Sequence, residues 1–339
     1  MRYILRGRSR NKAYYCKALS GLSSYNICIN CDLTVSCNCQ DYNGDGQIGD
    51  LNVTSLEEIF RGGRAQAFRQ KLAEGELPLS TCQHCVELVA VSAREARHYL
   101  KRFDLPRKGI MVENTIRCNL RCLYCARGKT LEIRRQKQIT LEQTEKVAKL
   151  LKQHNIAQVC YFNLGEPFLS NNIYQEITLI RKYNPDIAIY LSTNGMLIDN
   201  EAKVEAALML DHIFFSIDGP SQEVLGKYQV GGSFEQAFAN MNRVITARNA
   251  RSLHTPIIEW KYVVFAWNDH DEHINRAINL AEAAGVDLIS FVQGGGSAEN
   301  FSTRYANSAF FSSLGEVSER GREVWFTKNR GHVSMKASP

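Results

Sequence analysis

The sequence predicts an α/β protein in which a partial parallel (β/α)6 barrel follows a small cysteine-rich domain. Two observations favour this fold class. From about residue 110 onward, short runs of β-branched and aromatic residues alternate with helical stretches, and strands that alternate with helices pair in parallel through right-handed crossovers. Ahead of that region, seven of the 11 cysteines lie between Cys16 and Cys85. A chain of 339 residues has room for both parts.

The domain boundaries follow from these two patterns. We expect the cysteine-rich domain over residues 1–109, the barrel over 110–300 and a C-terminal extension over 301–339. The extension is weakly patterned, and a helix within it could close the barrel.

The barrel strands are expected where β-rich runs are bounded by Gly, Pro, Asn or Asp. Helical patterns separate them, most clearly at 141–154, where Thr140 and Gln143 form a capping box. Six units are fewer than the eight of a complete barrel, and the chemistry of such folds lies at the C-terminal ends of the strands. The predicted strands are 111–117, 158–164, 187–193, 212–218, 257–265 and 287–293.

Composition excludes several classes of protein. The hydrophobic fraction is 44%, yet no stretch approaches the roughly 18 apolar residues that a membrane span needs. The N-terminus lacks the apolar core of a signal peptide. We therefore expect a soluble, cytoplasmic protein without a membrane partner. In a reducing compartment, clustered cysteines bind metal or carry out redox chemistry.

The formal net charge is +6, and a basic arm opens the chain. This arm is either a solvated terminus or a contact for an anionic substrate or partner. No aromatic platform or nucleic-acid-binding motif accompanies it, so a nucleic-acid partner is not expected. The arm consists of Arg2, Arg6, Arg8, Arg10, Lys12 and Lys17.

Polar or metal-binding residues follow the first four predicted strands, where a purely structural barrel would not need them. The first strand runs into three cysteines spaced by three and two residues. Three such thiolates can hold three irons of a [4Fe–4S] cluster and leave the fourth iron open. On a helix the same spacing would give one face, so a buried stripe or a zinc site is the alternative. The three cysteines are Cys118, Cys122 and Cys125.

On these residues the chain resembles the radical SAM superfamily, in which a CxxxCxxC loop follows the first strand. An aromatic residue, here Tyr124, precedes the last cysteine. The resemblance covers roughly residues 110–295. It implies a [4Fe–4S] cluster whose open iron binds S-adenosylmethionine (SAM).

The resemblance extends to the other strand ends. Gly165, Glu166 and Pro167 are similar to the family's GEP segment, which receives the amino group of SAM, although Leu164 stands where a second glycine is usual. The remaining positions that resemble SAM contacts are Ser192, Thr193 and Asn194 at the end of the third strand, and Ser216 and Asp218 at the end of the fourth, near the ribose or carboxylate.

The resemblance implies reductive cleavage of SAM to methionine and a 5′-deoxyadenosyl radical, which takes hydrogen from an unactivated C–H bond. It also implies an electron donor such as flavodoxin or ferredoxin. Cys160 lies inside the second predicted strand. Its thiol is either a small buried hydrophobe or a hydrogen-atom donor to a substrate radical.

The segment 16–88 resembles the SPASM/twitch extensions of radical SAM enzymes, which hold auxiliary [4Fe–4S] clusters and normally follow the barrel. The resemblance implies one or two such clusters. Two clusters need eight ligands and seven thiols are present, so one iron would lack a cysteine. A zinc ribbon is the alternative, although its two cysteine pairs would be unusually far apart. The candidate ligands are Cys16, Cys28, Cys31, Cys37, Cys39, Cys82 and Cys85.

These features favour an enzyme that abstracts hydrogen from a polar small metabolite, which the basic charge allows to be anionic. We favour a sugar or nucleotide-linked sugar of natural-product or glycan biosynthesis, with epimerisation, dehydrogenation or sulfur insertion as the outcome. One alternative is maturation of a ribosomally synthesised peptide. Another is a non-catalytic iron–sulfur electron carrier, which would have no need of Glu166, Asn194 or Asp218.

Overall fold

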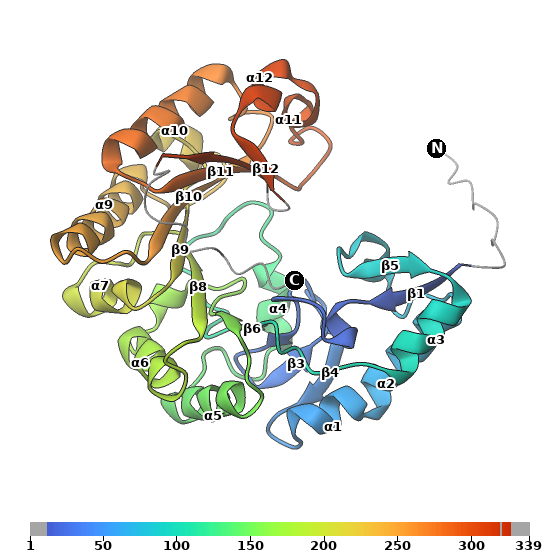
Figure 1. The fold of residues 1–339 in the computed structure, drawn as a ribbon. Coiled ribbons are helices and arrows are strands. Elements are labelled where there is room, and N and C mark those ends of the chain that lie inside the picture. Colours follow the sequence, from blue (N-terminus) through green and yellow to red (C-terminus); the bar gives the residue numbers. More distant parts are fainter. Residues whose placement is uncertain (1–11, 319–320, 327–339) are drawn as a thin grey trace.

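Six parallel strands form the centre of the fold, as predicted. In the computed structural model, which describes residues 12–318 and 321–326, each of these strands pairs in parallel with the next. Figure 1 shows them as one curved sheet. The first two end earlier than predicted, because the chain leaves the sheet there for its polar loops. The strands are β6 (Ile110–Val112), β7 (Gln158–Cys160), β8 (Ala188–Thr193), β9 (His212–Ser216), β10 (Ile257–Val264) and β11 (Leu288–Gln293).

Helices connect these strands and line the outer side of the sheet (Figure 1). The capping box predicted at Thr140 and Gln143 is present at the start of α5, and Asn200 and Ser233 cap α7 and α9 in the same position. None of the described helices is long and apolar enough to cross a membrane. The outer helices are α5 (Leu141–Gln153), α6 (Ile173–Tyr183), α7 (Glu201–Leu208), α9 (Phe234–Ala250) and α10 (Asp271–Ala284), with the shorter α4 (Arg127–Ile133) and α8 (Gln222–Gly226) in loops.

The two faces of the sheet differ because side chains alternate along each strand. The face toward the helices is apolar, with Val159, Ile189 and Ile213 fully buried in the main core. The opposite face, which we call the lumen face, carries Cys160 and His212 in the intervening register positions. The sequence pattern therefore reserves one face for packing and the other for polar and reactive groups.

The cysteine-rich region supplies three more strands to the same sheet. β2 (Cys28–Ile29) pairs in parallel with β6, and β3 (Thr34–Ser36) and β4 (Gln47–Asp50) follow in antiparallel order. The sequence did not predict this continuity. The rest of the region is β1 (Ala13–Cys16), η1 (Ala18–Ser20), α1 (Leu56–Arg61), α2 (Gly63–Ala73), η2 (Ser80–His84), β5 (Leu88–Val91) and α3 (Ala93–Lys101), where β1 and β5 form a separate two-stranded sheet.

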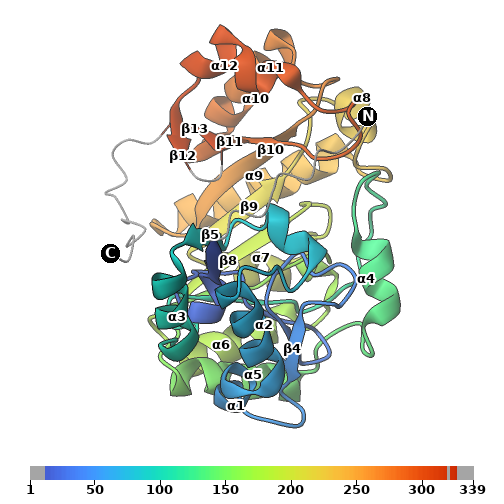
Figure 2. The same cartoon turned by 90° about the vertical axis from the view of Figure 1, so that its right-hand side faces the viewer.

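At the other end of the sheet, the C-terminal extension differs from the barrel-closing helix that we considered. β13 (Gly321–Trp325) pairs antiparallel with β11, and β12 (Glu316–Ser318) pairs with β13. Short helices α11 (Thr303–Asn307) and α12 (Ala309–Ser313) precede them and lie at the opposite end of the molecule from α1 (Figure 2). The basic arm from Arg2 to Arg10 lies outside the described residues.

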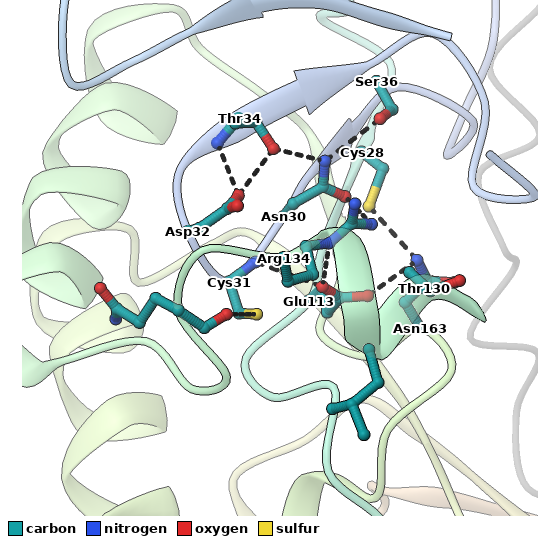
Figure 3. Close-up of polar contacts among 12 residues, drawn as sticks. Cys28, Asn30, Cys31, Asp32, Thr34, Ser36, Glu113, Thr130, Arg134 and Asn163 are labelled. Atoms are coloured by element: carbon teal, nitrogen blue, oxygen red, sulfur yellow. Dashed lines mark hydrogen bonds and ion pairs between the residues drawn. The ribbon is translucent and has the colours of Figure 1, made fainter. Parts of the chain in front are cut away.

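A buried ion pair joins the cysteine-rich region to the barrel (Figure 3). Glu113 follows β6 and accepts from Arg134 Nε at 2.9 Å, and both side chains are almost fully buried. Arg134 also donates to the side-chain oxygen of Asn30 at 2.7 Å, and Glu113 accepts from the backbone N–H of Cys31 at 3.4 Å. Each charged group thus contacts both parts of the chain.

We predict that Arg134→Ala lowers the free energy of unfolding by about 3–5 kcal/mol, because it leaves the Glu113 carboxylate buried without a counter-charge. The neighbouring Arg135 is a matched control, since its side chain is 59% exposed where it pairs with Asp50. Arg135→Ala should cost at most about 1 kcal/mol. Denaturant unfolding of both variants measures the difference. Equal losses would show that the buried pair does not hold the two parts together.

Candidate active site

The C-terminal ends of the barrel strands bring together the residues that the sequence singled out. The three-cysteine loop leaves β6 and is fixed by the backbone that follows α8. Arg121 N–H donates to the carbonyl of Val230 at 3.0 Å, and Leu123 N–H donates to that of Tyr228 at 3.1 Å. Gln229 in turn donates to the carbonyl of Ser216 at 2.9 Å, so the loop is tied to the end of β9.

The three thiols of this loop are electrostatic neighbours. Burial, together with negative charge on Asp218, Cys118 and Cys125, raises the pKa of Cys122 to about 12. Burial also raises the pKa of Cys118, while the backbone N–H of Leu120, donating to its sulfur at 3.4 Å, opposes that shift. Three thiolates would repel one another here, so their ionised forms need a bound cation.

Glu166 lies at the centre of the strand-end cluster. Its side chain is 2% exposed and accepts from Thr193 Oγ1 and Asn194 N–H, both at 2.7 Å, and from Phe168 N–H at 3.1 Å. Burial outweighs these hydrogen bonds and raises the pKa of Glu166 to about 7. The predicted GEP segment and the predicted third-strand residues are therefore in direct contact.

Close packing against the start of the cysteine loop requires glycine at position 165. A Cβ on Gly165 would lie 1.9 Å from the carbonyl oxygen of Thr115, just before the cysteine loop. Glu166 N–H donates to the carbonyl of Arg117 at 2.8 Å in the same contact. Only glycine allows this segment to pack so closely against the start of the loop.

Asn194 links the third strand to the cysteines. Its side-chain amide donates to Asn119 Oδ1 at 2.9 Å and reaches the sulfur of Cys118 at 3.7 Å. The Ser192 and Ser216 hydroxyls, from β8 and β9, lie 3.4 Å apart. These side chains form one polar rim beside the loop.

Asp218 completes this rim from the end of β9. Its side chain is 2% exposed and accepts from Val263 N–H at 2.8 Å. Burial raises the pKa of Asp218 to about 7, although that hydrogen bond and the charge of Lys261 act in the opposite direction.

An aromatic group covers the loop, and only Tyr124 within it was predicted from the sequence. Its ring lies 6.3 Å from those of Tyr228 and Phe265, and Phe265 stacks on Trp267 at 4.5 Å. Tyr228 follows α8, and Phe265 follows β10. Nothing in the local sequence distinguishes these rings from core aromatics, because their common location depends on how distant segments meet at the ends of the strands.

Below the rim, the lumen face holds a buried polar network. His212 Nε2 lies 2.8 Å from Glu259 Oε2, and Ser290 donates to the other oxygen of the same carboxylate. Phe214 stacks on the His212 ring at 4.3 Å. Glu259 was considered as a lumen residue from the sequence, whereas His212 and Ser290 were missed because their strands contain few other polar residues.

Four of the seven N-terminal cysteines line one cavity. They come from β1, from the residue after β3, and from η2 with its C-cap, and the rest of the wall is mostly apolar, with four leucines, Phe68 and Pro78 beside Asn38 and Thr81. Asn38 donates its side-chain amide to the sulfur of Cys85 at 3.2 Å. The four cysteines are Cys16, Cys37, Cys82 and Cys85.

A single metal ion needs donors that lie close together. Zinc bonds to sulfur at about 2.3 Å, so the thiolates around one zinc ion lie roughly 3.8 Å apart. Among the described residues, no three His, Cys, Asp or Glu side chains are arranged to hold one metal ion. Four cysteine thiols around one cavity are a donor set that a [4Fe–4S] cluster can use.

The other three N-terminal cysteines do not line that cavity. Cys28 lies on β2 beside the barrel, Cys31 follows it, and Cys39 donates to Asn26 Oδ1 at 3.1 Å. The structure thus divides the predicted set of seven into a group of four and a remainder of three.

Two family models match the chain. That of the radical SAM superfamily matches residues 112–258, and that of the SPASM iron–sulfur cluster-binding domain matches residues 16–86. The latter match supports the SPASM resemblance at its unusual position ahead of the barrel.

Similar proteins include GTP 3′,8-cyclases. That of Limosilactobacillus fermentum is 27% identical over 203 residues, which are 58% of each chain. That of Peptoclostridium acidaminophilum is 30% identical over 38% of this chain and 39% of its own. The chain thus matches little more than half the length of the first of these relatives.

Solved structures with a similar fold are more distant. Streptococcus suis SuiB gives a TM-score of 0.45 at 13% identity, with 70% of this chain and 53% of the other covered. The enzyme anSMEcpe with bound AdoMet gives 0.43 at 19% identity, with 57% and 54% covered. Both family models match in succession along the sequence, so the chain carries a radical SAM domain over residues 112–258 and, ahead of it, a SPASM iron–sulfur cluster-binding domain over residues 16–86.

Proposed function

We propose that this chain cleaves SAM reductively at a cluster held by Cys118, Cys122 and Cys125. The resulting radical would abstract hydrogen from a polar small metabolite in the barrel lumen. The observation that carries the proposal is that the three thiols, the hydrogen-bonded Glu166 carboxylate and Asp218 meet at one end of the strands. When bound, the cluster supplies the electron that splits SAM into methionine and the radical that takes the substrate hydrogen. The chain's own residues orient these groups and exclude water.

Each strand end has a distinct part in this proposal. The three cysteines hold the cluster, and the Asn194 amide fixes Cys118 by its contact with the sulfur. The Glu166 carboxylate already accepts three hydrogen bonds from the chain. We therefore assign it the role of bracing β8 against the loop, with backbone carbonyls of the GEP segment left to accept from the SAM amino group. Ser192, Ser216 and Asp218 would face the rest of SAM.

The lumen face supports a polar, ring-shaped substrate. The Phe214 ring, stacked on His212, offers an aromatic surface, and half-buried Lys261, in register with Ser216 on the same face, offers a hydrogen-bond donor. Such a combination suits a sugar or a nucleotide-linked sugar, whose ring has apolar faces and polar edges. A soluble reductant such as flavodoxin or ferredoxin would deliver the electron, and we place the reaction in the cytoplasm.

A second candidate is the cyclisation of GTP, favoured by the names of the similar proteins. The identity of 27–30% extends over 38–58% of this chain in the two relatives described. Because the longer of these two matches spans 58% of each chain, the substrate of the whole protein is open to direct test.

The first prediction from this proposed function concerns radical initiation. The triple variant Cys118→Ala/Cys122→Ala/Cys125→Ala should form no 5′-deoxyadenosine with SAM and dithionite, whereas the reconstituted wild type forms it. The variant should keep the iron of its N-terminal domain, which controls for misfolding. Product from both proteins at equal rates, or SAM binding by neither, would contradict the proposal and favour the electron-carrier alternative.

The second prediction concerns the bracing role of Glu166. Its folded-state pKa of about 7 lies above the ordinary 4.5, so its contribution to stability is complete below pH 4.5 and is lost as the pH rises through 7. Relative to wild type, metal-free Glu166→Gln should therefore gain about 3 kcal/mol of unfolding free energy between pH 4 and pH 8. Urea unfolding at both pH values measures this change. The exposed Glu282→Gln is the control, and an identical pH trend in all three proteins would contradict the buried carboxyl.

The third prediction concerns the substrate. SAM cleavage should accelerate with nucleotide-linked sugars and not with GTP. Substrates deuterated on the sugar ring should transfer deuterium to 5′-deoxyadenosine, which mass spectrometry detects. Deuterium transfer from the ribose of labelled GTP, with consumption of GTP, would overturn the sugar assignment in favour of the relatives' reaction.

A further inference from the structure

Lys261 is a charged side chain on the lumen face of β10. Its Cα pairs in register with that of Ser216 on β9 and with that of Ser290 on β11. Trp260 and Tyr262, the residues before and after it, are buried in the main core on the helix side of the sheet. Because side chains alternate along a strand, Lys261 projects from the opposite face, into the lumen.

Solvent reaches the part of the lumen face around Lys261. The Lys261 side chain is half-buried, and so are Ser216 beside it and Phe214 one row closer to the start of the strands. On the helix side of the same strand, Trp260 and Tyr262 are completely buried. The lumen side of these central strands is therefore the more accessible of the two faces.

The positive charge of Lys261 is not paired within the protein. Over residues 12–318 and 321–326, its ammonium group has no hydrogen bond or ion pair. Glu259 lies two residues earlier on the same face, but its carboxylate contacts His212 Nε2 at 2.8 Å and accepts from the Ser290 hydroxyl. The acidic residue of the same strand face is thus held by other partners.

Two further carboxyl groups of this face also have partners of their own. Asp218, at the end of β9, accepts from Val263 N–H at 2.8 Å. Glu323 on β13, in register with Ser290, accepts from Ser318 Oγ at 2.7 Å. The fold therefore leaves Lys261 as a positive charge that an incoming group can pair with.

The donors around Lys261 suit an anionic oxygen group. A lysine ammonium is a compact charge with three donors, and it commonly binds phosphate or carboxylate oxygens. The hydroxyls of Ser192 and Ser216, which lie 3.4 Å apart, add two donors from the neighbouring strands. A neutral substituent would make weaker hydrogen bonds with the same groups.

An aromatic wall lies one row below this donor group. It consists of Phe214 and Phe162, whose ring centres are 6.3 Å apart. Phe214 is in register with Glu259, two residues before Lys261. Two residues along a strand and one strand across give roughly 8 Å between the backbones of Phe214 and Lys261. This separation suits a ring that stacks on Phe214 and carries a charged substituent toward Lys261.

We propose that Lys261 binds an anionic group of the substrate, a phosphate or a carboxylate, while the sugar ring lies against Phe214. The inference rests on the proposed function, because it assigns the charged part of the substrate that enters the lumen. It makes Lys261 a specificity-determining residue that favours acidic or phosphorylated sugars over neutral ones.

Isothermal titration calorimetry of the full-length, anaerobically reconstituted protein with SAM tests this assignment. Glucose 1-phosphate and glucuronate carry a phosphate and a carboxylate on the same ring, and glucose is their neutral counterpart. At least one of the two anionic sugars should bind wild type more tightly than glucose does. Lys261→Met should weaken that binding by about 10- to 100-fold, which is the effect of one hydrogen bond to a charged group. The anionic sugar that shows the loss identifies the group bound.

The matched control is Lys152→Met, which removes an exposed lysine from the outer helix α5 and should bind the sugars as wild type does. Circular dichroism of both variants should equal that of wild type. Lys261→Met should also keep the wild-type affinity for SAM.

These binding measurements need no turnover, so they separate this proposal from the proposed function. Failure of the proposed function would appear as absence of 5′-deoxyadenosine, whatever the sugars do. Wild type that binds neither anionic sugar more tightly than glucose would overturn the role of Lys261. So would an unchanged preference in Lys261→Met, or a loss of SAM affinity in that variant, which would place the lysine at SAM.

Discussion

The parallel pairing of β2 with β6 determines how the two parts of this protein work together. It makes the cysteine-rich region a continuation of the barrel sheet, and it aligns Cys28 with Met111 and Cys160. The buried Glu113–Arg134 pair accompanies this junction. Removing two charges from water is costly, and an apolar pair of the same size would often be more stable. We interpret the ion pair as a device that fixes the register of β2, because its hydrogen bonds to Asn30 and Cys31 form in only one alignment.

The second constraint is the burial of the thiols. Burial raises the pKa of every cysteine in the N-terminal cavity, so the metal-free protein keeps them protonated. Metal binding must release those protons, and its free energy then contributes to folding. The same desolvation acts on Glu166 and Asp218 at the rim. Ionisable groups are therefore buried at each place where a charged cofactor would bind. The charge of that cofactor would offset the cost of burying their ionised forms.

Local patterns in the sequence were sufficient for the six barrel strands and for the polar residues at their ends. Alternating side chains define a strand, and a loop that follows a strand must lie at its end, so Glu166, Asn194 and Asp218 could be expected to meet. Pairing between distant segments leaves no such local pattern. β2 has only two residues, and its place beside β6 depends on buried partners far along the chain. The aromatic neighbours of Tyr124, the His212–Ser290 network and the strands of the C-terminal extension were missed for the same reason.

The central claim is that three thiolates of the loop hold a cluster whose remaining iron binds SAM. Electron paramagnetic resonance of the reduced protein tests it directly. Comparison with the variant Cys118→Ala/Cys122→Ala/Cys125→Ala, which keeps the thiols of the N-terminal cavity, identifies the part of the signal that comes from the loop. We predict that SAM shifts the g values of this signal, because it coordinates the open iron. A reducible cluster whose spectrum does not change with saturating SAM would contradict the account.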